Sequence, residues 1–158
     1  MAHVLHQGEH LVTRFWWAVM ARPTSAADRF WAVSTLLPGE LVLFDQMTRP
    51  DQEHHLRVAR RFLERVPSGA PREWVAAALM HDVGKLECGL GTAGRVLASV
   101  WPFGRRGDGR LGRYHRHEAI GAMLVRQAGS HADTVALVGE WPDAPVAAAE
   151  ALRSADDL

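Results

Sequence analysis

The chain has few of the features that mark secreted, membrane-embedded or nucleic-acid-binding proteins. Its one cysteine, Cys88, cannot form an internal disulfide, which suits a reducing compartment. Because its 18 Lys and Arg balance its 18 Asp and Glu, no net charge attracts it to nucleic acid or to an anionic membrane. The most apolar early stretch, residues 15–20, is too short to cross a bilayer. We therefore expect a cytoplasmic protein with no membrane partner and no strong affinity for nucleic acid.

Strand-like patterns are also lacking. No segment alternates strictly between apolar and polar residues, whereas apolar residues recur at helical spacing along most of the chain. At 158 residues, of which 47% are hydrophobic, the chain is long enough for one compact domain with a real core. The sequence therefore predicts an all-α fold. Periodicity, capping residues and prolines place its helices at residues 26–36, 40–47, 50–66, 72–83, 117–128, 133–140 and 145–155.

The N-terminal helices and one loop stand apart from the rest of the chain. We expect residues 1–39 to form a helical extension of a core domain at residues 40–158. The aromatic residues of this extension could pack on the core or form a homodimer interface, and periodicity does not separate the two outcomes. Residues 104–112, which are rich in Gly and Arg, are expected to form a mobile loop.

The dipeptide His81-Asp82 places two metal-binding side chains next to each other. It lies near the end of a hydrophobic helix, where neighbouring side chains diverge by about 100 degrees and can bracket an ion beside the axis. The partial negative charge of the last helical carbonyls would favour a cation there. Gly84 is expected to supply a left-handed cap. Lys85 follows Asp82 by three residues, close enough to reach a phosphate oxygen, and is our candidate catalytic stabiliser.

The dipeptide is part of a longer pattern that resembles a known family. The pattern consists, in order, of His54, residues 56–59 (LRVA), residues 81–85 (HDVGK) and residues 155–156 (AD). In order and separation these elements resemble the HD superfamily of metal-dependent phosphohydrolases, over roughly residues 40–158. The resemblance implies a compact helical bundle in which His54, His81, Asp82 and Asp156 bind a divalent transition metal. Mn, Fe or Zn would suit these ligands best, and Mg, Co and Ni also remain open.

The resemblance also implies an activity. The ion would lower the pKa of a water that attacks phosphorus, with Asp82 and Lys85 as the catalytic residues and a small phosphate ester, most naturally a nucleotide, as substrate. The alternative is a regulatory module that binds metal or a nucleotide with little turnover. A third option is an iron-dependent oxygenase, since relatives on this scaffold use paired irons.

A second segment resembles one branch of the same superfamily. Residues 117–122 (HEAIGA) are similar to the His-Pro-Glu-x-Gly-Ala segment of the HD-GYP branch, where the histidine serves a second metal, so His117 is a further candidate ligand. Where that branch has paired histidines, residues 138–142 read VGEWP, in which Glu140 could replace a histidine as a ligand or be an exposed helical glutamate. The Gly-Tyr-Pro motif is absent. The chain is therefore closest to a degenerate, single HD domain of that type.

Adjacent residues of the same type compete for several of these roles. His54 and His55 cannot both face one ion from a regular helix, and the family spacing favours His54. The same spacing favours Asp156 over Asp157. His117 could equally be a solvated residue at a helix start. Three arginines of the glycine-rich segment could clamp a phosphate or simply be solvated, namely Arg105, Arg106 and Arg113.

Overall fold

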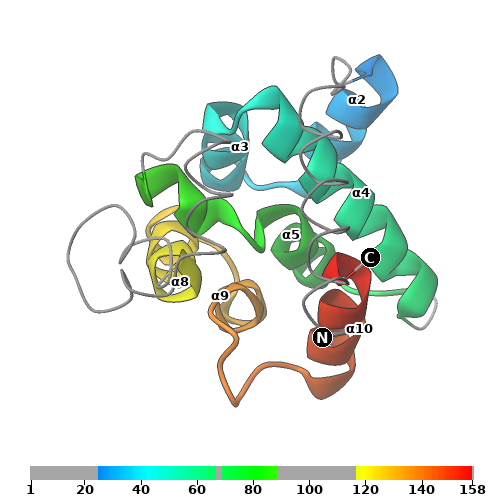
Figure 1. Ribbon diagram of the computed structural model, residues 1–158, viewed down its shortest axis with the longest axis vertical. Coiled ribbons are helices and arrows are strands. Elements are labelled where there is room, and N and C mark those ends of the chain that lie inside the picture. Colours follow the sequence, from blue (N-terminus) through cyan, green and yellow to red (C-terminus); the bar gives the residue numbers. More distant parts are fainter. Residues whose placement is uncertain (1–24, 67–68, 89–116, 158) are drawn as a thin grey trace, which may run out of the picture.

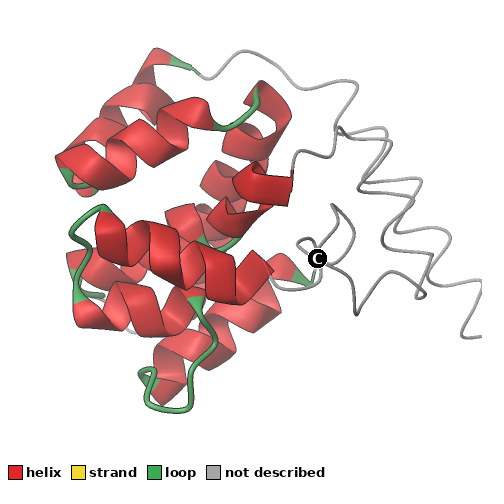
Figure 2. Cartoon of the chain, turned by 90° about the vertical axis from the view of Figure 1, so that its left-hand side faces the viewer, coloured by secondary structure: helices red, strands yellow, loops and turns green. Residues whose placement is uncertain are grey.

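The computed structural model describes residues 25–66, 69–88 and 117–157, and within these ranges every regular element is helical (Figures 1 and 2). The predicted all-α fold is confirmed for this part of the chain. The elements in order are α2 (Ala26–Thr35), α3 (Pro38–Gln46), α4 (Arg49–Arg65), α5 (Arg72–Met80), the 3-10 helix η1 (Val83–Cys88), α8 (His117–Gln127), α9 (Ala132–Val138) and α10 (Val146–Asp156). The predicted loop at residues 104–112 lies outside the described residues.

Three helix ends differ from the predicted ones by two or more residues: the start of α3, the end of α5, and the end of α9, which stops at Val138 before Glu140 with its positive φ of 52°. Helix α3 begins at Pro38, two residues earlier than expected, because proline is tolerated in a first turn and the Glu40 carboxylate accepts the Leu37 N–H at 2.7 Å. Helix α5 ends at Met80 rather than at residue 83. The chain there tightens into η1, and the Lys85 N–H bonds the Asp82 carbonyl at 3.0 Å.

Helix α5 lies in the middle of the fold, where it contacts α2, α3, α4 and α9 (Figure 1). All of its residues from Val75 to Met80 are buried, which agrees with a nearly continuous apolar sequence. Helix α4 packs against it through a stripe of buried residues, His55, Val58, Ala59 and Phe62. Helix α9 covers another side of α5, and α10 packs on α4. The C-terminal ends of α5 and α10 therefore both lie beside α4.

The N-terminal part of the described chain shares this core. Ala32 of α2 is fully buried in the same apolar cluster as Phe44 and Val58. The end of α2 is also tied to the start of α5, because the Arg72 guanidinium donates to the Thr35 carbonyl at 2.9 Å. Among the described residues, no helix has the length and apolarity that a membrane span requires.

Gly84 has a different role from the predicted one. The glycines with positive φ in the described part of the chain are Gly69 and Gly129, so Gly84 does not form a left-handed cap, and that prediction is wrong. Gly84 instead lies where η1 crosses α8. A β-carbon at this position would overlap the carbonyl oxygen of His117 and lie 2.7 Å from Gly121 N. The missing side chain therefore allows α8 to approach the turn that carries Asp82.

Candidate metal centre

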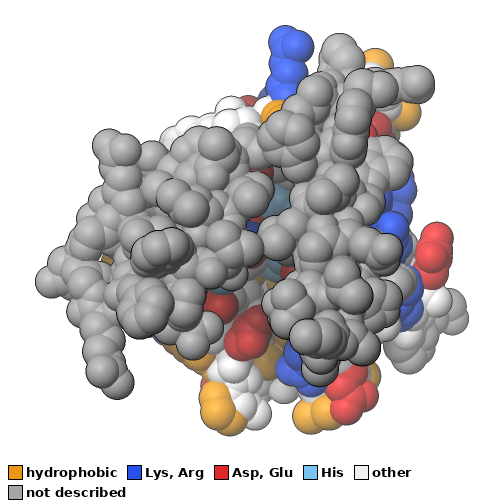
Figure 3. Space-filling view, in the orientation of Figure 1, with side chains coloured by type: hydrophobic (Ala, Val, Ile, Leu, Met, Phe, Trp, Pro, Cys, Tyr) orange, Lys and Arg blue, Asp and Glu red, His pale blue; other side chains and the backbone are white. Residues whose placement is uncertain are grey.

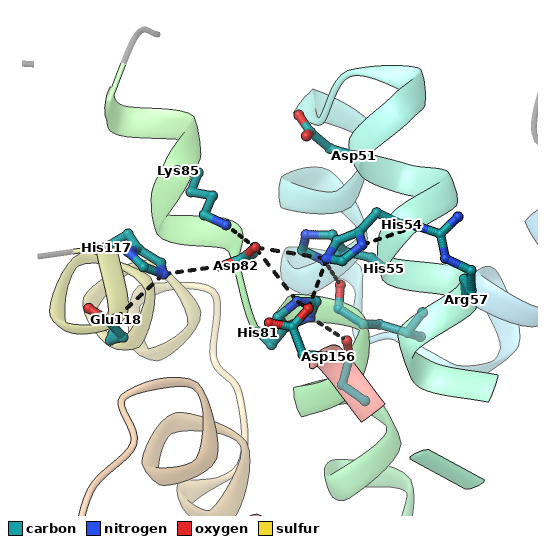
Figure 4. A network of polar contacts seen from close by, with 12 residues as sticks. Asp51, His54, His55, Arg57, His81, Asp82, Lys85, His117, Glu118 and Asp156 are labelled. Atoms are coloured by element: carbon teal, nitrogen blue, oxygen red, sulfur yellow. Dashed lines mark hydrogen bonds and ion pairs between the residues drawn. The ribbon is translucent and has the colours of Figure 1, made fainter. Parts of the chain in front are cut away.

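Four side chains from three helices and one turn converge at the ends of α5 and α10 (Figure 4). His54 comes from the middle of α4, His81 caps α5, Asp82 follows in the turn, and Asp156 is the last residue of α10. Asp156 Oδ1 lies 3.2 Å from His54 Nε2 and 3.5 Å from His81 Nε2. Asp82 Oδ2 lies 3.7 Å from His81 Nε2 and 4.0 Å from His54 Nε2. We call these four residues the His–Asp cluster.

The last carbonyls of α5 orient the imidazole of His81. His81 Nδ1 lies 3.0 Å from the Ala78 carbonyl oxygen, which can only accept, so Nδ1 carries the proton and Nε2 faces the cluster. The next carbonyl, that of Leu79, accepts from His55 Nδ1 at 2.7 Å. These carbonyls have no partner within the helix, and the two imidazoles supply one. In metal sites of other proteins, a histidine ligand is commonly oriented by such a hydrogen bond from the ring nitrogen that does not bind the metal.

The donor atoms of the cluster fit a metal ion. One donor atom each from His54, His81 and Asp82 lies within 4.8 Å of the other two, as ligands of one ion must. His81 Nε2 is buried, makes no close hydrogen bond to the described residues, and faces the carboxylates of Asp156 at 3.5 Å and Asp82 at 3.7 Å, so a cation between these groups would give all three a partner. Mixed nitrogen and carboxylate donors suit Mn, Fe or Zn. The observed cluster therefore has the chemistry of a site for one divalent cation.

Asp82 is the hub of the polar network. It is only 8% exposed, and a basic group contacts each of its oxygens: Lys85 Nζ contacts Oδ2, and His117 Nε2 lies 3.1 Å from Oδ1. Burial opposes the carboxylate charge, but Lys85, His81 and His117 outweigh it and hold the pKa of Asp82 well below its ordinary value. Asp82 is therefore ionised at neutral pH and available to a cation.

The pKa values of the histidines in the site are shifted in opposite directions. Burial lowers the pKa of His54 and, further, that of His55, so both are neutral near pH 7. Burial also opposes a charge on His81, but Asp82 and Asp156 outweigh it and raise the pKa of His81. Without metal, His81 therefore keeps a proton to a higher pH than an exposed histidine does.

Metal binding is accordingly expected to release protons and to strengthen as pH rises. A metal binds only neutral imidazole, so the proton on His81 opposes binding below its raised pKa, and the opposition is lost as pH rises through that pKa. Calorimetric titration with Mn²⁺ from about pH 6 to about pH 8.5, in two buffers of different ionisation heat, measures affinity and proton release together. The exposed His131 gives a control, His131→Gln, which should leave both unchanged. An affinity independent of pH would contradict this expectation.

The sequence did not single out the role of His55. Its side chain is 2% exposed, and its ring packs 4.5 Å from that of His81 and edge-on to that of His54, centroid to centroid 5.7 Å. His55 thus supports the site from inside the core rather than facing it. The signal was present in the sequence, because His55, Val58, Ala59 and Phe62 follow the helical spacing i, i+3, i+4, i+7 of a core stripe.

A cavity of about 260 Å³ opens beside the cluster, lined by His81, Asp82 and Asp156 on one wall. Histidine and acidic side chains are visible near the middle of the face seen in Figure 3. Glu140 also lines the cavity, but its side chain is exposed and bonds none of the described residues. Apolar residues of α9 and α10 also line the cavity: Leu137, Val138, Ala149 and Leu152.

The structure describes Asp157, the neighbour that competed with Asp156, but not the three candidate phosphate-binding arginines. Asp157 is exposed at the cavity rim, whereas Asp156 reaches both histidines of the cluster. The spacing favoured Asp156 over Asp157 as the metal ligand, and this assignment stays a prediction. The predicted phosphate-binding arginines lie outside the described residues, namely Arg105, Arg106 and Arg113.

A second group of potential metal ligands lies elsewhere and suits a cation less well. Glu73, His131 and Asp133 also bring three donor atoms within 4.8 Å of one another. They lie at the N-terminal ends of α5 and α9, where the positive ends of the helix dipoles disfavour a cation. His131 Nδ1 already accepts the Asp133 N–H at 3.2 Å as a helix cap. This group is therefore better explained as capping.

Comparisons of this chain with protein-family models, with curated proteins and with solved structures find no match.

Proposed function

We propose that this protein is a metal-dependent phosphohydrolase of the HD type that acts on a small phosphate ester, most naturally a nucleotide. The observation that carries the proposal is the convergence of His54, His81, Asp82 and Asp156, with the buried Nε2 of His81 left without a hydrogen bond among the described residues. Two imidazoles and two carboxylates leave coordination positions open on Mn, Fe or Zn, as a catalytic site requires.

The chain's own residues would divide the work of hydrolysis. His54, His81, Asp82 and Asp156 would hold a divalent ion which, when bound, supplies Lewis acidity toward a phosphate oxygen and acidifies water. Lys85 lies beside Asp82 and has a flexible ammonium that can donate to a phosphate oxygen. In this proposal the fixed tautomer of His81 keeps Nε2 aimed at the ion throughout the reaction.

The cavity supports a substrate of modest size. A volume of about 260 Å³ lies at the small end for ligand pockets, which favours a mononucleotide or a smaller ester over a dinucleotide. In our proposal the phosphate lies at the cluster and the apolar part of the ester lies against α9 and α10, where Leu137 and Leu152 face the cavity. Trp141 lines the same cavity and could contact a base.

One observation favours the alternative of a binding module with little turnover. Lys85 and His117 already neutralise both oxygens of Asp82, so the site can hold its charges together without chemistry. Such a module would bind metal or a nucleotide and release no product. Incubation of the metal-loaded protein with nucleoside monophosphates, followed by assay for both bound nucleotide and released phosphate, separates the two functions.

The adjacent aspartates of α10 give a matched test of the hydrolase. We expect Asp156→Ala to lower phosphate release by about 100-fold or more, because a ligand that touches both histidines is lost. Asp157→Ala removes the same charge one residue later, at an exposed position, and should retain activity to within about threefold. Equal losses in both variants would contradict the assignment of Asp156, and no phosphate release by the wild-type protein from any tested ester would contradict the hydrolase.

A further inference from the structure

Lys85 is the only lysine in the chain, whose other cationic side chains are all arginines. Its ammonium contacts Oδ2 of Asp82, whereas His117 approaches Oδ1 from α8 on the other side (Figure 4). The Lys85 side chain is 19% exposed and that of Asp82 9%, so the pair is largely removed from water. An ion pair in such surroundings is less screened than one at the surface.

The Asp82 oxygen that Lys85 contacts is the same one that faces the imidazoles of the His–Asp cluster. Asp82 Oδ2 is the carboxylate oxygen placed 3.7 Å from His81 Nε2 and 4.0 Å from His54 Nε2. A divalent ion held by these two nitrogens would therefore use Oδ2 as its carboxylate ligand and would lie close to the Lys85 ammonium. The divalent ion and the Lys85 ammonium would repel each other strongly if both contacted Oδ2 of Asp82.

We propose that Lys85 couples metal binding to phosphate binding by exchanging one anion for the other, an inference that rests on the proposed function. In the metal-free protein the ammonium neutralises Asp82. When a divalent ion takes Oδ2, its charge repels the ammonium from that oxygen, and a phosphate group at the same site gives the ammonium a new anionic partner. The metal therefore binds more tightly when phosphate is present, and phosphate binds more tightly when metal is present, by the same factor.

Lysine suits this exchange better than arginine does. Its ammonium is a compact charge on a flexible chain with donors that can point in any direction, so it can move between neighbouring anions. A guanidinium is a rigid planar fork that would grip one carboxylate. His117 is held by Asp82 Oδ1 and by Glu118, 3.5 Å away, so Asp82 keeps an orienting contact while Lys85 moves.

The coupling can be measured with Mn²⁺ and inorganic phosphate as the probes. In the wild-type protein we expect phosphate to tighten the Kd of Mn²⁺ by about tenfold, within the usual range of coupling between sites. In Lys85→Met, Mn²⁺ should bind about tenfold more tightly without phosphate, and the effect of phosphate should fall to the part that direct contact between phosphate and the ion supplies. Because phosphate in solution binds Mn²⁺ equally in both titrations, the difference between the two proteins isolates the coupling.

Two further variants control this titration. Lys85→Arg keeps the charge beside Asp82 and should retain the weaker, wild-type affinity without phosphate. Arg65→Met removes one positive charge from the C-terminal end of α4, where Arg65 bonds Ser154. It should leave the Mn²⁺ affinity unchanged both with and without phosphate. Tighter binding in Arg65→Met equal to that in Lys85→Met would show a general charge effect and overturn the proposal.

Selective lysine labelling tests the exchange without any substitution. Because the chain has one lysine, a protein grown with ¹³C-lysine gives a single ε-CH₂ resonance, that of Lys85. This resonance should shift when the site is saturated with the diamagnetic ion Zn²⁺, because the ammonium leaves Asp82. A resonance unchanged at full Zn²⁺ occupancy would overturn the exchange while leaving the proposed function intact. Failure of wild type and variants to bind any ion would overturn both.

Discussion

Asp82→Ala is expected to lower metal-dependent phosphate release by about 10³-fold or more while the protein stays folded. Asp82 Oδ2 faces the imidazole nitrogens of His54 and His81, 4.0 and 3.7 Å away, and Oδ1 holds His117. Its loss removes a ligand and leaves the orientation of the remaining groups unsupported. Phosphate release and circular dichroism on the same samples check both parts of the expectation.

The fold should survive because His81 keeps Asp156 as a charged partner, and the other two groups that lose a partner, Lys85 and His117, are not fully enclosed. The side chains of Lys85 and His117 are 19% and 20% exposed, so water can solvate both charges once the carboxylate is gone. Asp143→Ala, at an exposed turn between α9 and α10, is the control and should keep full activity. Activity of Asp82→Ala within about tenfold of the wild type would contradict a role for Asp82 in the reaction.

Gly84→Ala is expected to destabilise the protein by about 2–3 kcal/mol and to impair the site as well. The added methyl group would meet backbone atoms of α8, namely the His117 carbonyl and Gly121 N, and backbone cannot rotate away as a side chain can. The helix must therefore shift away from η1 and carry His117 away from Asp82. Chemical denaturation measures the first effect, and the Kd of Mn²⁺ measures the second.

A second glycine separates this steric effect from loss of backbone freedom. Gly129 has a φ of +83°, and a β-carbon there would meet nothing within 4 Å. Gly129→Ala should therefore cost only the strain of a left-handed alanine, about 1–2 kcal/mol, with no change in metal affinity. A Gly84→Ala variant as stable as the wild type would show that close packing of η1 on α8 does not require glycine at this position.

The helical architecture was predictable because the apolar spacing of each helix is a local property of the sequence. The errors occur where one specific side-chain or interhelical contact decides the local structure. Gly84 reads as a left-handed cap in isolation, yet its conformation follows from the approach of α8, which begins at His117. The start of α3 depends on the reach of the Glu40 side chain back to Leu37, which apolar periodicity does not report.

The candidate site was only partly predictable. The spacing of the His54 and His81-Asp82 elements indicated metal chemistry, and the structure brings these side chains together with Asp156. The sequence could not show that Lys85 would pair with the same oxygen of Asp82 that faces the imidazoles, because this depends on how η1 leaves α5. Nor could it show that His55 supports His81 through the Leu79 carbonyl, because that bond joins two helices.

Metal content, measured by plasma mass spectrometry on protein purified without a histidine tag, tests the central claim most directly. We predict about one transition-metal ion per chain for the wild type, either as purified or after reconstitution with Mn, Fe or Zn, and none for Asp82→Ala. Two ions per chain would add a second site, with His117 on Asp82 Oδ1 as its first candidate ligand. A wild-type protein that holds no ion after reconstitution would contradict the metal centre and the hydrolase with it.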